Sequence, residues 1–205
     1  MASFNDESEL IWDAEITIEG IDGITLNNNR TSLKVDDEYS EAELNVSTIP
    51  NYGSSIITID AVDRTSDLVI IGNSTNNVVT LGSSNTTVDG GTGNDKLYGG
   101  DGNDLFLYTA GQGTDTIYNY DGDSGDMISI GGGTTLDNSA FVNLGDGRAN
   151  IEVGNSVLYF GSITSPVFHV LYADEQQLDV DLTGLTFSSN RQNVTIDSDY
   201  NETTF

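Results

Sequence analysis

Two consecutive nine-residue stretches combine glycine and aspartate in a pattern that suits metal binding. GGTGNDKLY and GGDGNDLFL cover residues 90–98 and 99–107, and each carries an Asp at its sixth position, Asp95 and Asp104. Glycine has no Cβ, so the backbone can bend sharply and aim several carbonyl oxygens at one point. A short carboxylate beside these carbonyls adds a charged oxygen. The spacing therefore predicts a cation-binding turn in each stretch.

The available ligands favour calcium over other cations. Eight Asp and no Glu lie from Asp89 to Asp126, and the whole chain has no Cys and one His. Disulfides and thiolate zinc sites are therefore excluded. Ca²⁺ accepts roughly six to eight oxygens in flexible geometry, whereas Mg²⁺ prefers a strict octahedron and its own waters. An EF-hand loop that begins at Asp121 is rejected. Its sixth position, where the loop needs Gly, is Asp126, and its twelfth, where it needs Glu, is Gly132.

Apolar residues recur around these stretches with the same nine-residue spacing. Cut from Gly72, the chain reads GNSTNNVVT, LGSSNTTVD, GGTGNDKLY and GGDGNDLFL. The apolar residues in phase are Ile70, Val79, Val88, Leu97, Phe106 and, after two inserted residues, Ile117. This period fits neither a helix nor an ordinary hairpin. It predicts a solenoid in which every repeat adds one side chain to a continuous core.

The rest of the chain has the pattern of an all-β protein. Short β-branched runs alternate with Gly, Asn, Asp and Ser, and no helical apolar spacing persists over three turns. The strands predicted before the repeats are residues 15–18, 23–26, 32–35, 42–46 and 55–59. After the repeats, RANIEVGNSVLYF predicts a hairpin with Gly154 and Asn155 as its turn, and a further strand follows from Pro166.

Charge and motif content exclude several function classes. Acidic residues outnumber basic ones 33 to 6, giving a formal net charge of −27. Binding to nucleic acid or to an anionic membrane through a basic face is therefore excluded. No apolar run approaches the roughly 20 residues that a membrane span needs. The only histidine, His169, is expected to be a packing or surface residue, and no GxSxG elbow is present. We therefore expect that the protein has no catalytic residues and is not an enzyme.

Residues 90–98 and 99–107 resemble the nonapeptide GGxGxDxUx of the RTX, or hemolysin-type calcium-binding, family. The flanks ITIDAVDRTSDLVIIGN and LFLYTAGQGTDTIYNYDGDSGDMISI are similar to segments around such repeats, so the resemblance covers roughly residues 56–130. It implies a parallel β-roll with two nonapeptides per coil. Each ion would lie between turns stacked on the same edge of the roll, which are two repeats apart.

The resemblance implies two well-supplied calcium sites. The residues implied for the first are Gly90, Gly91, Gly93 and Asp95 together with Gly111, Gly113 and Asp115. The residues implied for the second are Gly99, Gly100, Gly102 and Asp104 together with Asp121 and Asp123 in the following segment. Two marginal sites would lie one coil earlier, where Asn77 and Thr86 replace the motif Asp.

Charge gives calcium a structural role in this interpretation. Closely spaced carboxylates repel one another, and a chain so rich in glycine cannot close these turns alone. We therefore expect calcium binding and folding to be one process. Extracellular sites of this chemistry bind at about 10⁻⁴ to 10⁻³ M, so the segment should be loose inside a cell and folded outside.

The expected architecture is a short parallel β-roll with a β-strand extension on one side and a cap on the other. Residues 1–63 would form the N-terminal extension, residues 64–125 the calcium-binding roll, and residues 126–205 an antiparallel β-hairpin cap with a candidate secretion-signal region. The acidic N-terminus lacks the features of a cleaved signal peptide. The resemblance then implies a bacterial protein, secreted or at the cell surface, exported by a type I secretion system.

Two alternatives remain open at this point. One is an adhesin or surface-layer component whose outer strands bind a surface or a glycan. The other is the C-terminal module of a larger secreted RTX enzyme or toxin.

Overall fold

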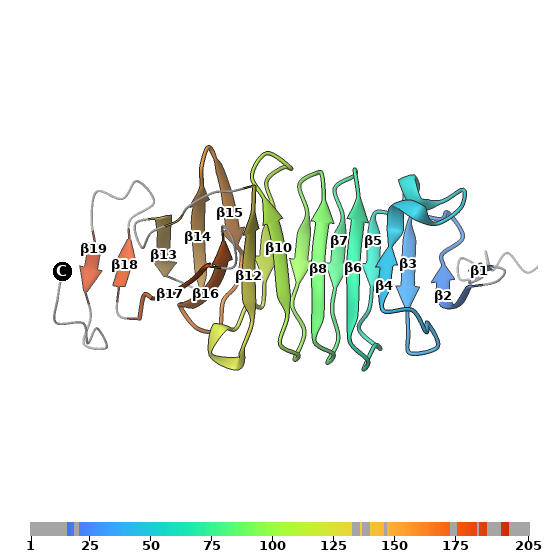
Figure 1. Ribbon diagram of the computed structural model, residues 1–205, viewed down its shortest axis with the longest axis horizontal. Coiled ribbons are helices and arrows are strands. Elements are labelled where there is room, and N and C mark those ends of the chain that lie inside the picture. The colour runs from blue at the N-terminus through green and yellow to red at the C-terminus, as the bar shows by residue number, and fades with distance from the viewer. Residues whose placement is uncertain are drawn as a thin grey trace, which may run out of the picture.

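The strands of the protein wind into an elongated roll of two facing sheets (Figure 1). The computed structural model describes residues 16–18, 21–132, 136, 140–145, 147–172, 176–183, 185–187 and 194–196. The helical elements with both ends in these residues are the short 3-10 turns η1 (Val46–Thr48), η2 (Gly53–Ser55) and η3 (Gly122–Ser124). The prediction of an all-β protein built on a parallel roll is confirmed. No helix of the described residues is long and apolar enough to cross a membrane.

Two sheets account for most of the described strands. The first has the order β1-β2-β3-β5-β7-β9-β11-β15-β14-β13. Its strands are β1 (Ile16–Ile18), β2 (Ile21–Leu26), β3 (Ser32–Val35), β5 (Thr58–Asp60), β7 (Val78–Thr80), β9 (Lys96–Tyr98), β11 (Thr116–Tyr118), β13 (Phe141–Gly145), β14 (Arg148–Val153) and β15 (Ser156–Phe160). The second has the order β17-β16-β12-β10-β8-β6-β4. Its strands are β4 (Glu43–Asn45), β6 (Leu68–Asn73), β8 (Thr86–Gly91), β10 (Leu105–Thr109), β12 (Met127–Gly131), β16 (Val167–Tyr172) and β17 (Gln176–Asp181). A separate pair joins β18 (Leu185–Phe187) to β19 (Val194–Ile196).

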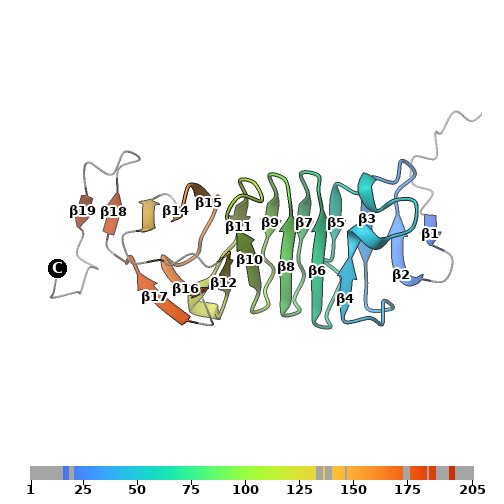
Figure 2. The ribbon, with the colours of Figure 1, turned by 45° about the horizontal axis from the view of Figure 1, so that its top comes forward.

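Strands that follow one another in the central chain alternate between the sheets, as Figure 2 shows for β5 to β10. Apolar side chains fill the space between the sheets in two in-register rows. The first row is Leu33, Ile59, Val79, Leu97, Ile117 and Phe160. The second row is Leu44, Ile70, Val88, Phe106, Ile128 and Val170. All are buried. The predicted nine-residue core period is therefore confirmed, and burial of each large side chain stabilises the fold by about 1.5–3 kcal/mol.

Antiparallel strands flank the parallel coils. At the N-terminal end, β1, β2 and β3 form a meander. At the other end, β14 and β15 form the predicted hairpin, in which Val153 pairs with Ser156 and Gly154 has a φ of 60°. The strand predicted from Pro166 is β16, which pairs with β17. Such strands cover part of the open edges that a solenoid would otherwise expose.

Parallel pairing extends beyond residues 64–125 in both directions. On the N-terminal side β3 pairs with β5, and on the other side β12 pairs with β16. The reason is that alternating apolar residues continue the core rows where the glycine motif is missing. The five strands predicted before the repeats are observed as β1 to β5, β3 with the predicted bounds and the others with shifted ends, while residues 1–15 lie outside the described residues. The closing NETTF, part of the predicted secretion-signal region, also lies outside them.

Two rows of turns connect the strands. The upper turns, at the top of Figure 1, are residues 46–57, 74–77, 92–95 and 110–115. The lower turns are residues 36–42, 61–67, 81–85, 99–104 and 119–126. Turns of one row come from alternate connections, so the two glycine-rich stretches lie in different rows.

Candidate metal centre

The upper turns stack the predicted residues of the first site. Asp115 Oδ1 accepts a hydrogen bond from the backbone N–H of Asp95 at 2.9 Å. Asp95 Oδ1 accepts in turn from the backbone N–H of Asn77 at 2.7 Å. Each carboxylate thus reaches the backbone of the preceding coil. The structure brings the Asp95 and Asp115 turns together, two repeats apart along the chain.

The lower turns contain an equivalent stack. Asp104 Oδ1 accepts from the backbone N–H of Thr86 at 3.0 Å, and Asp104 Oδ2 accepts from that of Gly100 at 3.0 Å. Asp126 Oδ1 accepts from the backbone N–H of Asp104 at 2.9 Å, and Asp126 Oδ2 accepts from that of Asp121 at 2.9 Å. Asp126 therefore has the position in the lower row that Asp115 has in the upper row.

Asp121 and Asp123 lie elsewhere in the same turn. The Asp121 carboxylate accepts hydrogen bonds from the Ser124 backbone N–H at 3.3 Å and from its hydroxyl at 2.9 Å. Asp123 is exposed. The signal for Asp126 is its distance from the core: it precedes Ile128 by two residues, as Asp95 precedes Leu97 and Asp104 precedes Phe106. Counting back from the core residue identifies it, whereas counting forward from the turn does not.

A second ladder, formed by the fifth residues of the motif, runs beside the carboxylates. In the upper row, Asn76 Oδ1 accepts from the Asn94 backbone N–H at 2.8 Å, and Asn94 Oδ1 accepts from that of Thr114 at 2.8 Å. In the lower row, Asn85 Oδ1 accepts from the Asn103 backbone N–H at 2.9 Å. The sequence motif leaves this position unspecified, so its role gave no signal in the sequence. These amides hold successive turns in register.

Glycines let the turns stack closely. Gly93 has a φ of 138° and Gly113 a φ of 148°, a region that side chains disfavour. A Cβ on Gly113 would collide with the Gly93 carbonyl oxygen, and a Cβ on Gly100 would collide with that of Gly82. The remaining predicted glycines are Gly90 and Gly91 at the end of β8, Gly99 and Gly102 in the lower row, and Gly111 in the upper row. Backbone carbonyls therefore lie against the α-carbons of the next coil.

The glycine-rich turns lie in the part of the chain that matches a known protein family. A family model of the RTX calcium-binding nonapeptide repeat (4 copies) matches residues 71–106 and 80–117. Residues 71–117 are RTX calcium-binding repeats. These repeats bind Ca²⁺, which confirms the predicted ion, and the motif is a calcium-binding one, not a catalytic one. Comparison with curated proteins gave no match, and neither did comparison with solved structures.

The stacked carboxylates of both rows are buried without basic partners. Asp95, Asp104, Asp115 and Asp126 expose only 1%, 1%, 4% and 2% of their surface. Burial raises the pKa of Asp95 to about 7 and that of Asp104 to about 6, and it also raises the pKa of Asp115 and Asp126. The groups that oppose these shifts are backbone hydrogen bonds, and none is a basic side chain. Buried carboxylates without basic partners must be balanced by a cation or neutralised by protons.

One RTX carboxylate oxygen is left without any partner. Asp95 Oδ2 is fully buried and makes no hydrogen bond, although Oδ1 of the same carboxylate accepts from Asn77. It lies against the α-carbon of Gly90, where a Cβ would displace it. Within the described residues, no three or more His, Cys, Asp and Glu side chains gather at one point. The other ligands of an ion here would be backbone carbonyls and water, a set of hard oxygens that suits Ca²⁺.

The lower turns border an open cavity of about 610 Å³. Its lining includes Gly99, Gly100, Gly102, Asp121 and Asp126. His169 lies away from this lining, in a surface pair in which its Nδ1 is 2.7 Å from Asp179 Oδ1.

Proposed function

We propose that the protein is an extracellular calcium-binding protein of bacterial origin whose RTX turns become ordered when they bind calcium. The observation that supports this most directly is the orphaned, buried Oδ2 of Asp95 in the stack with Asp115. Without a cation, the folded state must either protonate these carboxylates or bury their charge, whereas the unfolded chain hydrates them. Calcium removes this disadvantage, and its binding free energy then becomes folding free energy.

The proposed upper site uses Asp95 and Asp115 with the glycine turns that begin at Gly90 and Gly111. The proposed lower site uses Asp104 and the turn that begins at Gly99, together with the main chain of the segment that holds Asp121 and Asp123. We add Asp126 to the lower site, because its carboxylate meets the Asp104 backbone. Sites with few carboxylates and many carbonyl ligands are weak, so we expect dissociation constants near 10⁻⁴ to 10⁻³ M.

Weak calcium binding would allow the chain to be exported before it folds. RTX repeats occur in secreted bacterial proteins. Inside a cell, where calcium is scarce, the repeats would stay unfolded and could pass through a type I secretion system. Outside, calcium would close the turns. In this proposal the chain has a structural, non-enzymatic role.

The test is to record circular dichroism and thermal unfolding with EDTA, with about 10 mM Ca²⁺ and with about 10 mM Mg²⁺, well above the expected dissociation constant. We expect added β-structure and a higher Tm with Ca²⁺ alone. An unchanged Tm in EDTA would refute calcium-coupled folding.

Calorimetric titration of single variants then separates the sites. Asp95→Ala and Asp115→Ala should weaken one ion, and Asp104→Ala should weaken another. Asp101→Asn, an exposed carboxylate in the lower row, is the control for charge alone. Depletion of one and the same site by all three alanine variants would contradict the two-row arrangement.

A further inference from the structure

The lower turn at residues 61–67 contains a buried guanidinium. Arg64 is 4% exposed. Its Nη1 donates hydrogen bonds to the carbonyl oxygens of Asp36 at 2.7 Å and Tyr39 at 2.6 Å, both in the preceding lower turn. Its Nε donates to the Ser66 carbonyl at 3.0 Å. A positive group held by backbone carbonyls thus lies between two stacked turns, in the same row as Asp104 and Asp126.

The upper row has a neutral counterpart in the same part of the roll. Asn73 and Asn77 are 7% and 1% exposed. Asn73 Nδ2 donates to the carbonyl oxygens of Gly53 at 2.6 Å and Ile56 at 2.7 Å. Asn77 Nδ2 donates to those of Ile56 at 3.0 Å and Ile57 at 3.3 Å. The side-chain amides therefore donate hydrogen bonds to the carbonyl oxygens that converge between the upper turns at residues 46–57 and 74–77.

Residue type at the ligand position changes along both rows. In the lower row, in-register pairing and the carboxylate stack give Leu68, Thr86, Asp104 and Asp126 from the N-terminal side onward. In the upper row the corresponding series is Ile57, Asn77, Asp95 and Asp115. The ligand positions beside Arg64 and the two amides thus carry no carboxylate; Asp37, whose Oδ1 lies 3.9 Å from Arg64 Nε, belongs to the turn but not to a ligand position. Carbonyl oxygens that already accept N–H groups make poor metal ligands, and the guanidinium repels a dication.

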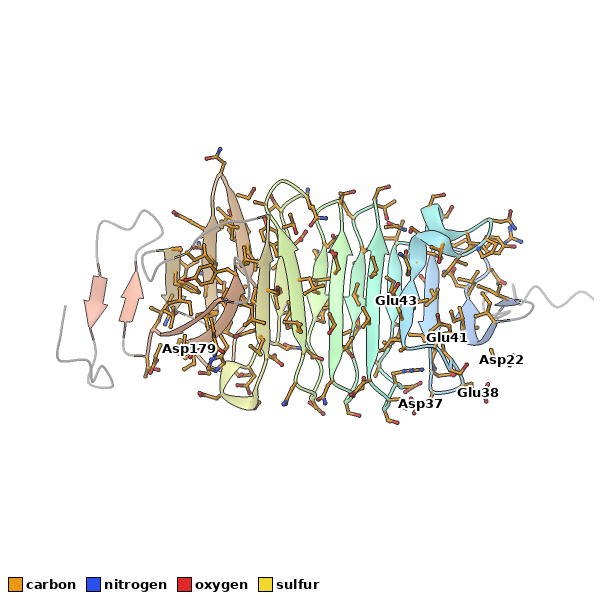
Figure 3. All side chains as sticks on the ribbon, viewed as in Figure 1. Asp22, Asp37, Glu38, Glu41, Glu43 and Asp179 are labelled. Atoms are coloured by element: carbon orange, nitrogen blue, oxygen red, sulfur yellow. The ribbon has the colours of Figure 1, made fainter. Side chains whose placement is uncertain are left out.

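From these contacts we propose that Arg64, Asn73 and Asn77 stand in for calcium in the N-terminal coils and set where the calcium sites begin. The coils formed by residues 21–80 then fold without calcium and present β7 as a template for the RTX turns. This inference rests on the calcium-coupled folding proposed above. Around Arg64, Asp37 adds a further tie between the same two turns, because its Oδ1 accepts from the Thr65 and Ser66 backbone N–H groups at 3.0 and 3.1 Å. Figure 3 labels Asp37 at the lower edge of these coils.

Hydrogen exchange of the wild-type chain, with EDTA and with calcium, is the first test. We expect backbone amides of β3, β5 and β6 to stay protected in EDTA, and amides of β9, β10 and β11 to gain protection only with calcium. Loss of protection throughout the chain in EDTA would overturn the proposal. Full protection throughout would instead refute calcium-coupled folding, and the variants below would then decide whether the three residues stabilise the N-terminal coils.

Arg64→Met removes the guanidinium and keeps an apolar side chain of similar length. We expect the N-terminal coils to lose protection in EDTA and not to regain it with calcium, because Leu68 gives the ion no carboxylate there. Arg30→Met is the control, since Arg30 is an exposed arginine of the same half whose guanidinium lies 5.1 Å from the Tyr52 ring centroid. Equal behaviour of the two variants would overturn the role of Arg64.

Asn77→Asp tests the proposal by gain of function, and it remains informative if the Arg64 variant fails to fold. The new carboxylate cannot donate to Ile56 and Ile57, and it completes a pair with Asp95. We expect less protection of β5 and β7 in EDTA, recovery with calcium, and an additional bound calcium ion by equilibrium dialysis. Asn76→Asp makes the same charge change one residue away and can still accept from Asn94, so it should do neither. An Asn77→Asp protein with unchanged protection and unchanged calcium content would overturn the proposal.

Discussion

Asp104 donates its backbone N–H to Oδ1 of Asp126 at 2.9 Å, although 22 positions separate the two residues. The corresponding spacing from Asn77 to Asp95 is 18 positions. The lower turn at residues 119–126 accommodates its extra residues as the 3-10 turn η3. The carboxylate still reaches the stack, because the following strand fixes it relative to the core residue Ile128.

This geometry predicts different roles for the aspartates of the last lower turn. Asp126→Asn keeps an oxygen that can accept from Asp104 but removes the charge, so we expect calcium affinity at the lower site to fall by about tenfold or more. Asp123→Asn changes an exposed carboxylate and should leave the affinity nearly unchanged. Calorimetric titration of both variants measures the difference. Equal losses would assign the ion to the outer part of the turn.

Local spacing explains how much of this arrangement the sequence could predict. Leu97 and Phe106 keep the nine-residue phase, so the solenoid followed from the sequence, whereas the stacking of alternate turns was implied by the resemblance to RTX repeats. The position of Asp126 in the lower stack did not follow from the sequence, because inserted residues break the nine-residue phase before it. The donors in the N-terminal turns were also missed, since Arg64 contacts carbonyls 25 and 28 positions away, and such contacts leave no periodic signal.

The buried carboxylates predict an unusual pH dependence in the calcium-free protein. The pKa of Asp95 rises from 3.8 to about 7 and that of Asp104 to about 6, so between these limits the folded state holds more protons than the unfolded state. Stability in EDTA should therefore be greatest near pH 4 and fall as the pH rises to about 7. Thermal unfolding in EDTA at about pH 5 and about pH 8 tests this. A higher Tm at the higher pH would contradict it.

Asp37 sets the lower limit of the pH range in which this test is informative. Hydrogen bonds from Thr65 lower its pKa to about 2, so its stabilising contribution is complete above pH 3.8 and is lost below it. Measurements above about pH 4.5 avoid this opposite effect. Over the same range, calcium must displace protons from Asp95 and Asp104. Calorimetry near pH 6, in buffers of different ionisation enthalpy, should therefore detect proton release that disappears near pH 8.

Two glycines of the upper turn at residues 110–115 separate the effect of backbone strain from the effect of packing. Gly111 and Gly113 have φ values of 87° and 148°, so alanine is strained at both. A Cβ on Gly111 meets nothing within 4 Å, whereas a Cβ on Gly113 would collide with the Gly93 carbonyl oxygen. We expect Gly111→Ala to cost about 1 kcal/mol and Gly113→Ala at least twice as much. Urea unfolding in saturating calcium gives both values, and equal costs would show that the coils can move apart freely.

Buried tyrosine hydroxyls link each row of turns to the core. Tyr120 Oη donates to the Asp126 carbonyl at 3.0 Å and accepts from the His169 backbone N–H at 3.1 Å. Its ring stacks on Phe168 with centroids 5.4 Å apart, so Tyr120→Phe should keep the aromatic packing. Because the change leaves buried polar groups unpaired, we expect a loss of about 1–3 kcal/mol in unfolding free energy. Calcium affinity should fall at the lower site, where the Asp126 turn loses its anchor.

Tyr108 provides the matched variant in the upper row. Its hydroxyl donates to the Gly113 carbonyl at 3.1 Å, and its ring is also buried. Tyr108→Phe should therefore weaken the upper site and spare the lower one, the reverse of Tyr120→Phe. Titration of each variant in an Asp104→Ala background, which isolates the upper site, makes the comparison direct: Tyr108→Phe should lower the remaining affinity and Tyr120→Phe should not. If both changes lowered it equally, the hydroxyls would stabilise the roll as a whole instead of positioning individual turns.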